Sequence, residues 1–342
     1  GSNGGLAANY SINTGQTTTA NITAKTLTAT ASASNKVYDG ITTATSTLTF
    51  SGLIGSETLG QTVGSTFDNK NVGTGKTVTV NSITLADGSN GGLAGNYSIS
   101  PGQTTTANVT AKSLTVSGIT SANKTYDGNT VATLNTSSVL YSGLVAGDTF
   151  SGSYTGAFAN ANVGTGKTVT ISPTYSGADV SNYNITNHST ITADISKKAL
   201  TATASAPNKV YDGNATATTT LTLSGLIGSE TLGQSVGSTF NNKNVGTGKT
   251  VTVNSITLAN GSNGGLAANY SISAGQTTTA NITAKALTVS GITASNKTYD
   301  SNTTATLNTG SVSYTGLVGG DVFNGTYTGA FSDKNVGTGK TV

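Results

Sequence analysis

The strongest constraint on this chain is an internal repeat that appears four times with little change. The string NKVYDG at residues 35–40 returns as NKTYDG, NKVYDG and NKTYDS. Its tyrosines are Tyr38, Tyr126, Tyr211 and Tyr299, which stand 88, 85 and 88 residues apart. A sequence with such a period is typical of a row of similar domains, each in contact mainly with its neighbours.

Two kinds of repeat alternate. Type 1 contains SGLIGSETLGQ and ends on a block that reads NYSI and then GQTTTAN, whereas type 2 carries LTVSGIT near its start. We therefore divide the chain into five segments. Residues 1–25 are the end of a truncated repeat, 26–112 a type 1 repeat, 113–198 a type 2 repeat, 199–285 a second type 1 repeat and 286–342 a truncated type 2 repeat. Because both ends fall inside a repeat, we expect the sequence to be a piece of a longer array, with no signal peptide in view.

The length of the repeat favours one β architecture over another. Solenoid coils repeat every 20 to 30 residues or so, whereas about 85 to 100 residues make one immunoglobulin-like sandwich. In the first full repeat we expect strands at 27–33, 42–50, 61–67, 76–85, 96–100 and 104–110, separated by turn segments such as DNKNVGTG. The predicted fold class is all-β: a tandem array of immunoglobulin-like β-sandwich repeats that forms an extended rod.

The composition excludes several functions. Charged residues make up 8% of the chain, and the 16 basic residues are all lysines spread over the repeats, so we expect no nucleic-acid binding, which needs clustered basic charge. Cysteine is absent, which removes disulfides and thiolate metal sites. No apolar run approaches the roughly 20 residues of a membrane span. The abundant Thr, Ser, Asn and Gly suit half-exposed strands and turns rather than helices.

One strand carries an irregularity that the sequence reveals. In KTVTVNSITL, Val78 and Val80 share one parity, whereas Ile83 and Leu85 share the other. Because side chains alternate strictly along a strand, a β-bulge near Asn81 and Ser82 is needed to turn all four toward one core. The other type 1 copy, with Val251, Val253, Ile256 and Leu258, repeats the shift. Type 2 does not, because Val169, Ile171 and Tyr175 keep one parity.

The junctions between repeats are short. The final segment TTTANVTAK runs into SLTVSGI through Lys112 and Ser113, with no Gly, Pro or other spacer. We expect stiff junctions, with those at Lys112 and Lys285 alike and that at Lys198 different, since only the first two join type 1 to type 2.

These repeats resemble the tandem YDG-type and MBG-type repeats of giant secreted bacterial adhesins, many of them built like filamentous haemagglutinin and exported by two-partner secretion. The resemblance rests on Tyr-Asp-Gly after the first strand, the VGTGKTVTV segment, and the NYxI and AxITxK endings, and it covers the whole chain. It implies a surface-exposed, immunoglobulin-like region and brings no catalytic residues. Ser301 replaces the glycine of the motif, so we expect an altered turn there.

VGTGKT looks like part of a nucleotide-binding P-loop, in which Gly75, Lys76 and Thr77 would close the motif. The first glycine of that motif is missing from every copy, and a Val-Thr strand follows instead of a helix. The positions that should hold it are Lys70, Ala161, Lys243 and Lys334. We therefore expect a hairpin turn at VGTGKT.

Asp39 is a candidate calcium ligand, but a calcium site needs six to eight oxygens, and the other acids of the repeat, Glu57, Asp68 and Asp87, lie far apart in sequence. Asp68 is also Asn241 in the other type 1 copy. We expect Asp39 to cap an Asx turn, with Tyr38 packed into its own sandwich.

The remaining candidates are weaker. His188 is the only histidine and has no partner nearby in sequence, which indicates a surface loop. The Thr-x-Thr patterns lack the coil-by-coil ladder of an ice-binding surface. Asn21, Asn108 and Asn281 lie in glycosylation sequons, whose use stays open. Lys36 and Lys76 are expected to be free of isopeptide crosslinks, since buried acids are scarce.

We expect a structural stalk or filament segment of a large extracellular bacterial adhesin or matrix fibre, which spaces a binding tip from the cell surface. Alternatively, the repeats bind directly, by lateral self-association of copies into a biofilm-matrix fibre or by binding a carbohydrate, because few charges guard their edge strands. We expect no enzymatic activity, no catalytic, cofactor-binding or metal-ligating residue and no cofactor. The expected partners are neighbouring repeats of the same chain and other copies beside it.

Overall fold

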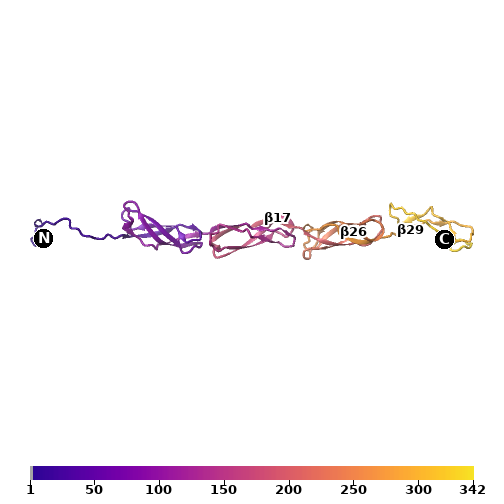
Figure 1. The fold of residues 1–342 in the computed structure, drawn as a ribbon, viewed down its shortest axis with the longest axis horizontal. Helices are drawn as coiled ribbons and strands as arrows, with labels where there is room; N and C mark the ends of the chain where they lie inside the picture. Colours follow the sequence, from indigo (N-terminus) through magenta and orange to yellow (C-terminus); the bar gives the residue numbers. More distant parts are fainter. Residues whose placement is uncertain (1–2) are drawn as a thin grey trace. The chain divides into compact units, whose positions relative to one another are not determined.

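The computed structural model describes residues 3–342, and the fold is all-β. In these residues the only helical segments are four short 3-10 turns: η1 (Ala7–Asn9), η2 (Ala94–Asn96), η3 (Val180–Asn182) and η4 (Ala267–Asn269). None of the described helices has the length and hydropathy that a membrane span requires. The part of the described chain before Lys25 contains no strand (Figure 1).

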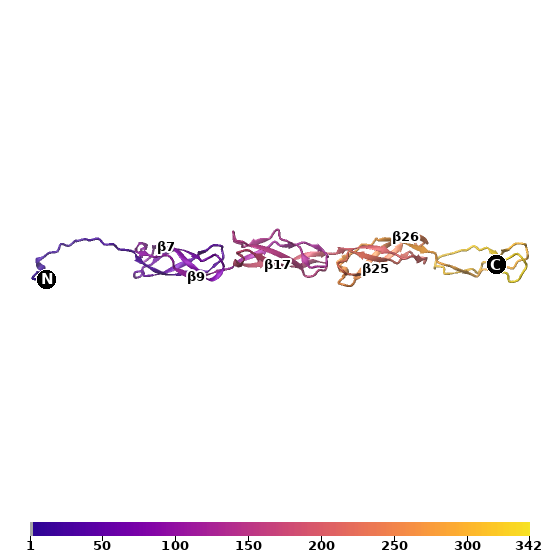
Figure 2. The same ribbon diagram turned by 90° about the horizontal axis from the view of Figure 1, so that it is seen from below.

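The first repeat divides its strands between one large and two small sheets. Its strands are β1 (Lys25–Thr26), β2 (Thr28–Ala33), β3 (Lys36–Val37), β4 (Thr43–Ala44), β5 (Ser46–Ser51), β6 (Leu59–Phe67), β7 (Gly73–Asp87), β8 (Tyr97–Ser98) and β9 (Thr104–Thr110). The five-stranded sheet has the order β3-β9-β7-β6-β4, and β7 lies beside β9 (Figure 2). Strand β2 pairs antiparallel with β5, and β1 pairs parallel with β8.

Two expected strands of this repeat were wrong in extent. The segment 42–50 is not one strand, because the chain leaves the five-stranded sheet at Thr45: β4 pairs with β6, whereas β5 pairs with β2. The segment 96–100 shortens to β8, because Asn96 ends the turn η2. Strand β3 was not expected at all, since a strand of two residues has too little sequence to show a pattern.

The predicted bulge is confirmed, and its extra residue is Asn81. Strand β6 pairs Ser65 with Val80 and Gly64 with Ser82, so Asn81 has no partner across the ladder. Beyond it, Ile83 and Leu85 lie opposite Val63 and Gln61, which share a face of β6 with Ser65 and Phe67. All four apolar side chains of β7 therefore face one side: Val78 and Val80 are buried, and Ile83 and Leu85 half-buried. The third repeat makes the same shift at Asn254.

The second repeat contains a three-stranded sheet in which β10 pairs antiparallel with β15 and parallel with β18. Its strands are β10 (Lys112–Ser117), β11 (Thr120–Ser121), β12 (Lys124–Thr125), β13 (Val131–Ala132), β14 (Leu134–Asn135), β15 (Leu140–Ser142), β16 (Ser151–Phe158), β17 (Gly164–Ser176), β18 (Tyr183–Asn187) and β19 (Thr190–Ser196). From Lys167 onward, strand β17 alternates without a shift, with Val169 and Ile171 buried and Tyr175 half-buried, as the sequence predicts. Only Ala111 separates β9 of the first repeat from β10 of the second.

The third repeat has the same arrangement as the first, with a five-stranded sheet of order β22-β28-β26-β25-β23. Its strands are β20 (Lys198–Ala199), β21 (Thr201–Ser205), β22 (Lys209–Val210), β23 (Thr216–Ala217), β24 (Thr220–Ser224), β25 (Leu232–Phe240), β26 (Gly246–Asn260), β27 (Tyr270–Ser271) and β28 (Thr277–Thr283). The fourth repeat holds β29 (Thr288–Ser290), β30 (Thr293–Ala294), β31 (Thr304–Ala305), β32 (Leu307–Asn308), β33 (Ser313–Thr315) and β34 (Gly329–Ala330).

The chain divides into two compact units, and the division falls inside the second repeat. The first unit holds the residues up to Ser121 with Thr133–Gly156 and Thr170–Ile191, and the second holds Ala122–Ala132, Ala157–Val169 and Thr192–Val342. The end of the first repeat and the start of the second therefore lie in one unit, and the later junctions lie in the other.

Candidate functional site at the junctions between repeats

The tyrosine of the Tyr-Asp-Gly motif reaches into the next repeat. Tyr38 follows β3, and its side chain is 1% exposed. Its hydroxyl donates to Asp148 of the second repeat, at 2.9 Å from Oδ1 and 2.8 Å from Oδ2. The expectation that Tyr38 packs into its sandwich is confirmed but incomplete: the buried cluster around it includes Phe67 and Val78 of its own repeat and also Leu114 and Tyr183 of the second repeat.

Asp148 collects donors from both repeats. Besides Tyr38, it accepts a bond of 2.5 Å from the Tyr183 hydroxyl and one of 2.9 Å from the Lys70 ammonium. The rings of Tyr38 and Tyr183 meet edge to face at 5.6 Å. Burial alone raises the pKa of Asp148, but the bonds from Tyr183, Lys70 and Tyr38 outweigh it and hold that pKa below its usual value. The carboxylate is thus kept charged at the centre of the junction.

A second contact joins the two repeats through an asparagine. The Val72 amide donates to Oδ1 of Asn182 at 2.9 Å, and Nδ2 of Asn182 donates to Oδ1 of Asn71 at 3.1 Å. Asn182 ends the turn η3 and is 1% exposed. Both polar ends of this buried amide therefore have partners in the preceding repeat, which satisfies the general requirement for buried polar groups. We call this contact the asparagine clamp.

The next junction uses the same two devices. The Tyr126 hydroxyl donates to Oε1 of Glu230 at 2.6 Å, and the Tyr270 hydroxyl donates to Oε2 at 2.6 Å. The asparagine clamp here joins Asn269 to Val163 and Asn162, at 3.0 and 3.1 Å. At the third junction, Asp321 raises the pKa of Tyr211 above its usual value, and Lys243 only partly opposes this. The acid is Asp in type 2 repeats and Glu in type 1.

The copy of the clamp asparagine that has no folded repeat before it is exposed. Asn96 occupies the clamp position of the first repeat and is exposed, whereas Asn182 and Asn269 are each 1% exposed. The burial of this asparagine thus depends on the adjoining repeat.

The glycine of the motif makes room for the next repeat. A Cβ on Gly40 would lie 2.7 Å from Val145 Cγ1, and one on Gly128 would lie 2.8 Å from Ile227 Cγ2, closer than real Cβ atoms approach. Both glycines also have positive φ, at 82° and 79°. Ser301 keeps the same backbone conformation at φ 66°, so the expectation of an altered turn was wrong.

The YDG domain model matches residues 23–107, 110–193, 196–280 and 283–342. The chain belongs to the YDG domain family. A comparison with curated proteins gave no match. The tyrosine and the glycine that characterise these YDG repeats are thus the residues that contact the following repeat, whereas the aspartate between them has a local role.

That local role is the predicted Asx turn. The Ile41 amide donates to Oδ1 of Asp39 at 3.2 Å, and Lys36 Nζ lies 2.7 Å from the same oxygen. The ammonium also donates to the Ile41 and Thr43 carbonyls, at 2.7 and 3.0 Å. Lys36 therefore holds the YDG loop together, and one of the two carboxylate oxygens of Asp39 is paired with an ammonium and an amide. Whether Lys36 or Lys76 is crosslinked stays a prediction for mass measurement.

The VGTGKT segment has a different place from the one expected. The turn lies earlier, between the end of β6 and Gly73, and VGTGKT opens strand β7 with a register shift between Gly73 and Lys76. The Gly75 amide donates to Oδ1 of Asn108 at 2.7 Å, and Lys76 donates to Asn69 Oδ1 at 2.7 Å. A strand follows the glycines, so no helix N-terminus is present there to bind a phosphate.

The other candidates remain apart from the junctions. His188 is exposed between β18 and β19. Asn108 and Asn281 lie in strands and accept bonds from Gly75 and Gly248, whereas Asn21 is exposed outside any strand. Among residues 3–342, no group of three or more His, Asp or Glu is placed to hold a metal ion.

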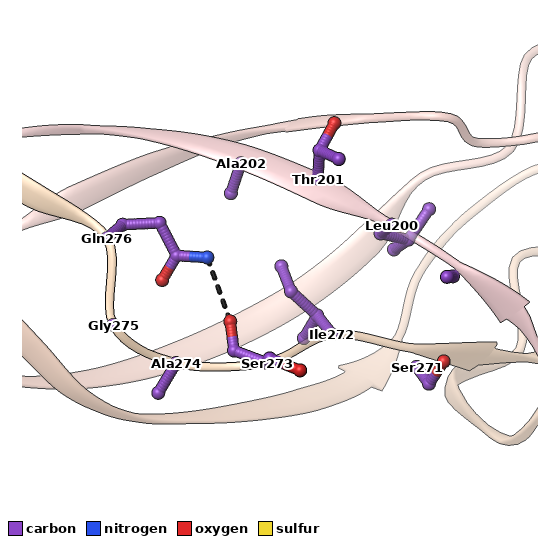
Figure 3. A pocket seen from close by; sticks show the side chains of 10 residues that line it. Leu200, Thr201, Ala202, Ser271, Ile272, Ser273, Ala274, Gly275 and Gln276 are labelled. Carbon is purple, nitrogen blue, oxygen red and sulfur yellow. Dashed lines mark hydrogen bonds between the residues drawn. The ribbon is translucent and has the colours of Figure 1, made fainter.

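A shallow cleft of about 470 Å³ lies in the third repeat beside β21 and β27. Figure 3 shows Gln276 at its edge, with Nε2 donating to the Ser273 carbonyl at 2.8 Å. Its Oε1 is buried without a partner, and so is Oε1 of Gln103 at the same position of the first repeat. Each type 1 repeat thus has one buried amide oxygen without a hydrogen-bond partner.

The sequence did not point to Asp148, Asn182 or Lys70 as functional residues. Their partners lie up to 111 residues away, so no local pattern links them. The only sign of these residues in the sequence is their recurrence at fixed positions. An acid lies shortly after SGL in every full repeat, and Asn-Tyr precedes the final strand in each.

We predict that the junctions weaken between about pH 10 and pH 12. Burial and the bonds to Glu230 and Asp148 raise the pKa of Tyr126 and of Tyr183 to about 12 each, above the value near 10 of an unfolded chain. Stability from a raised pKa is complete below the unfolded value and is lost as pH rises through the folded one. Tyrosinate absorbance should therefore show a late titrating class, and over the same range the Val163 amide should lose protection relative to its intrinsic exchange rate at each pH. The Tyr126→Phe variant should lose part of that class. Titration of all tyrosines near pH 10 would contradict this picture.

Proposed function

We propose that this chain is a stalk or filament segment of a large extracellular bacterial adhesin or matrix fibre, in which YDG repeats hold a binding region away from the cell surface. The observation that supports this proposal is that successive junctions use the same contacts: a tyrosine hydroxyl bound to an acid of the next repeat, beside an asparagine clamp. A spacer needs joints that resist pivoting. A single enzyme or receptor domain has no such need for identical joints.

The joint itself offers little freedom. Ala111 alone separates β9 from β10, and Lys197 alone separates β19 from β20. A linker of one residue lets two strands turn only about a few backbone bonds. The buried contacts on either side then oppose the remaining motion.

We also propose that each repeat is an immunoglobulin-like sandwich. In favour of this, the first repeat has a five-stranded sheet and a second group formed by β8, β1, β2 and β5. Leu27 and Leu48 of the second group are buried, as are Val78 and Val109 of the first. Two sheets with buried inner faces are the pattern of that fold.

Small-angle scattering on tandem duplications of the whole chain tests the stalk. A stiff array should nearly double its maximum dimension when the repeat number doubles, about a twofold rise. If the repeats were flexibly joined, the maximum dimension should rise only about 1.4-fold. As a control, a Gly-Ser spacer inserted after Ala111 and at the matching junctions should shift the chain toward the second behaviour. Growth near 1.4-fold without the spacer would end the proposal.

Direct binding is the alternative, and the structure offers features for and against it. Against edge pairing, Gln61 caps strand β5, because its Nε2 donates to the Leu48 carbonyl at 2.7 Å and its Oε1 accepts from the Leu48 amide at 3.0 Å. In favour of a carbohydrate, the cleft is lined by Gln276, whose buried Oε1 has no hydrogen-bond partner. Electron microscopy that shows single rods favours the spacer, whereas ordered bundles favour lateral association.

A further inference from the structure

The junction from type 1 to type 2 contains an ion triad. Nζ of Lys70 lies 2.9 Å from Oδ1 of Asp148 and 2.8 Å from Oδ1 of Asp179. The side chains of the two acids are only 2% and 10% exposed, whereas Lys70 is 35% exposed. Asp148 and Asp179 are both within 3 Å of one nitrogen, so each carboxylate feels the charge of the other. The lysine of the first repeat therefore neutralises an acidic face of the second.

The junction from type 2 to type 1 lacks all of these charges except one. Ala161 occupies the place of Lys70, and Leu266 precedes turn η4 where Asp179 precedes η3. Glu230 remains, held by two tyrosine hydroxyls. At these two junctions the lysine and the second acid are thus present together or absent together.

The lysine and the second acid depend on each other, because a repeat end without the lysine would leave the two acids unpaired. A repeat end with alanine at this position, as at Ala161, set against the acidic face would leave Asp148 and Asp179 without a cation in a largely buried site. Removing one partner of a buried ion pair is costly, since the other charge stays desolvated. A type 1 end set against Leu266 would suffer less, because a lysine can extend its ammonium to water.

We propose that Lys70 and Asp179 are specificity residues of the junction: the acidic face that carries Asp179 packs stably only against a repeat end that carries a lysine at the place of Lys70. The third junction has Lys243 at that place and Asp321 at the place of Asp148. The inference concerns which repeat ends fit together and stands apart from the proposed stalk function.

Reciprocal variants of the whole chain test it, with the Val72 and Val163 amides as reporters because each donates to a clamp asparagine. Lys70→Ala should speed hydrogen exchange of the Val72 amide about tenfold, as expected for the loss of a charge-assisted contact. Adding Asp179→Leu to Lys70→Ala should return the rate to within about threefold of the parent, since the unpaired acid is then gone.

The converse pair transplants the charges to the other junction. Leu266→Asp alone should speed exchange of the Val163 amide, and Ala161→Lys added to it should restore protection. The Val80 amide, bonded to Gln103 inside the first repeat, serves as the folding control and should stay unchanged. The proposal is overturned if Lys70→Ala leaves Val72 protected, or if neither second substitution rescues the first. If Lys70→Ala also speeds exchange of the Val80 amide, that variant has a folding defect. The result for Leu266→Asp with and without Ala161→Lys then decides whether the proposal holds.

Discussion

Replacing Asp148 by alanine should lower the free energy of unfolding by about 3 kcal/mol, the usual cost of stranding one side of a buried ionic contact. The carboxylate is 2% exposed and accepts bonds from Tyr38, Tyr183 and Lys70. Its removal leaves two buried hydroxyls short of an acceptor, while the Lys70 ammonium keeps only Asp179. Urea unfolding followed by tyrosine fluorescence measures the change, since the chain has no tryptophan.

Glu57→Ala is the matched control. Glu57 holds the same position in the first repeat and accepts the Tyr97 hydroxyl, but within residues 3–24 the only tyrosine, Tyr10, is 75% exposed. Its loss should cost about 1 kcal/mol, the net value of one ordinary hydrogen bond. Equal effects of the two substitutions would mean that Asp148 acts only within its own repeat.

Gly128→Ala should destabilise the chain by about 3 kcal/mol, for two additive reasons. A left-handed backbone costs an alanine about 1 kcal/mol, and Gly128 has φ 79°. The new Cβ would also stand 2.8 Å from Ile227 Cγ2, and overpacking of this kind costs about 2 kcal/mol. The same urea titration gives the value, and exchange of the Val163 amide locates the defect at the junction.

Gly248→Ala separates the two reasons. Gly248 has φ 57°, but no atom lies within 4 Å of the position that a Cβ would take, so its substitution should cost only the backbone strain of about 1 kcal/mol. A Gly128→Ala variant no less stable than Gly248→Ala would show that the junction yields to the added methyl group. Ser301 shows that the backbone strain by itself is tolerated in this chain.

The strand pattern shows how far sequence reasoning reaches. The parity change between Val80 and Ile83 required a bulge, and the ladder has it at Asn81, because side-chain alternation is a local rule that needs no knowledge of the fold. The same reasoning missed the break at Thr45. There, β4 and β5 enter different sheets, and the polar residues on either side give no local sign of the change.

The sequence by itself determined the repeat period, the alternation of two repeat types, the all-β character and the family, since each depends on order along the chain. Tertiary structure alone decided what the residues of the recurring motif do. Tyr38 looked like a core residue, and its partner Asp148 stands 110 residues away in another repeat. A hydrogen bond requires two groups about 3 Å apart, and no spacing rule predicts which end of one folded repeat meets which loop of the next.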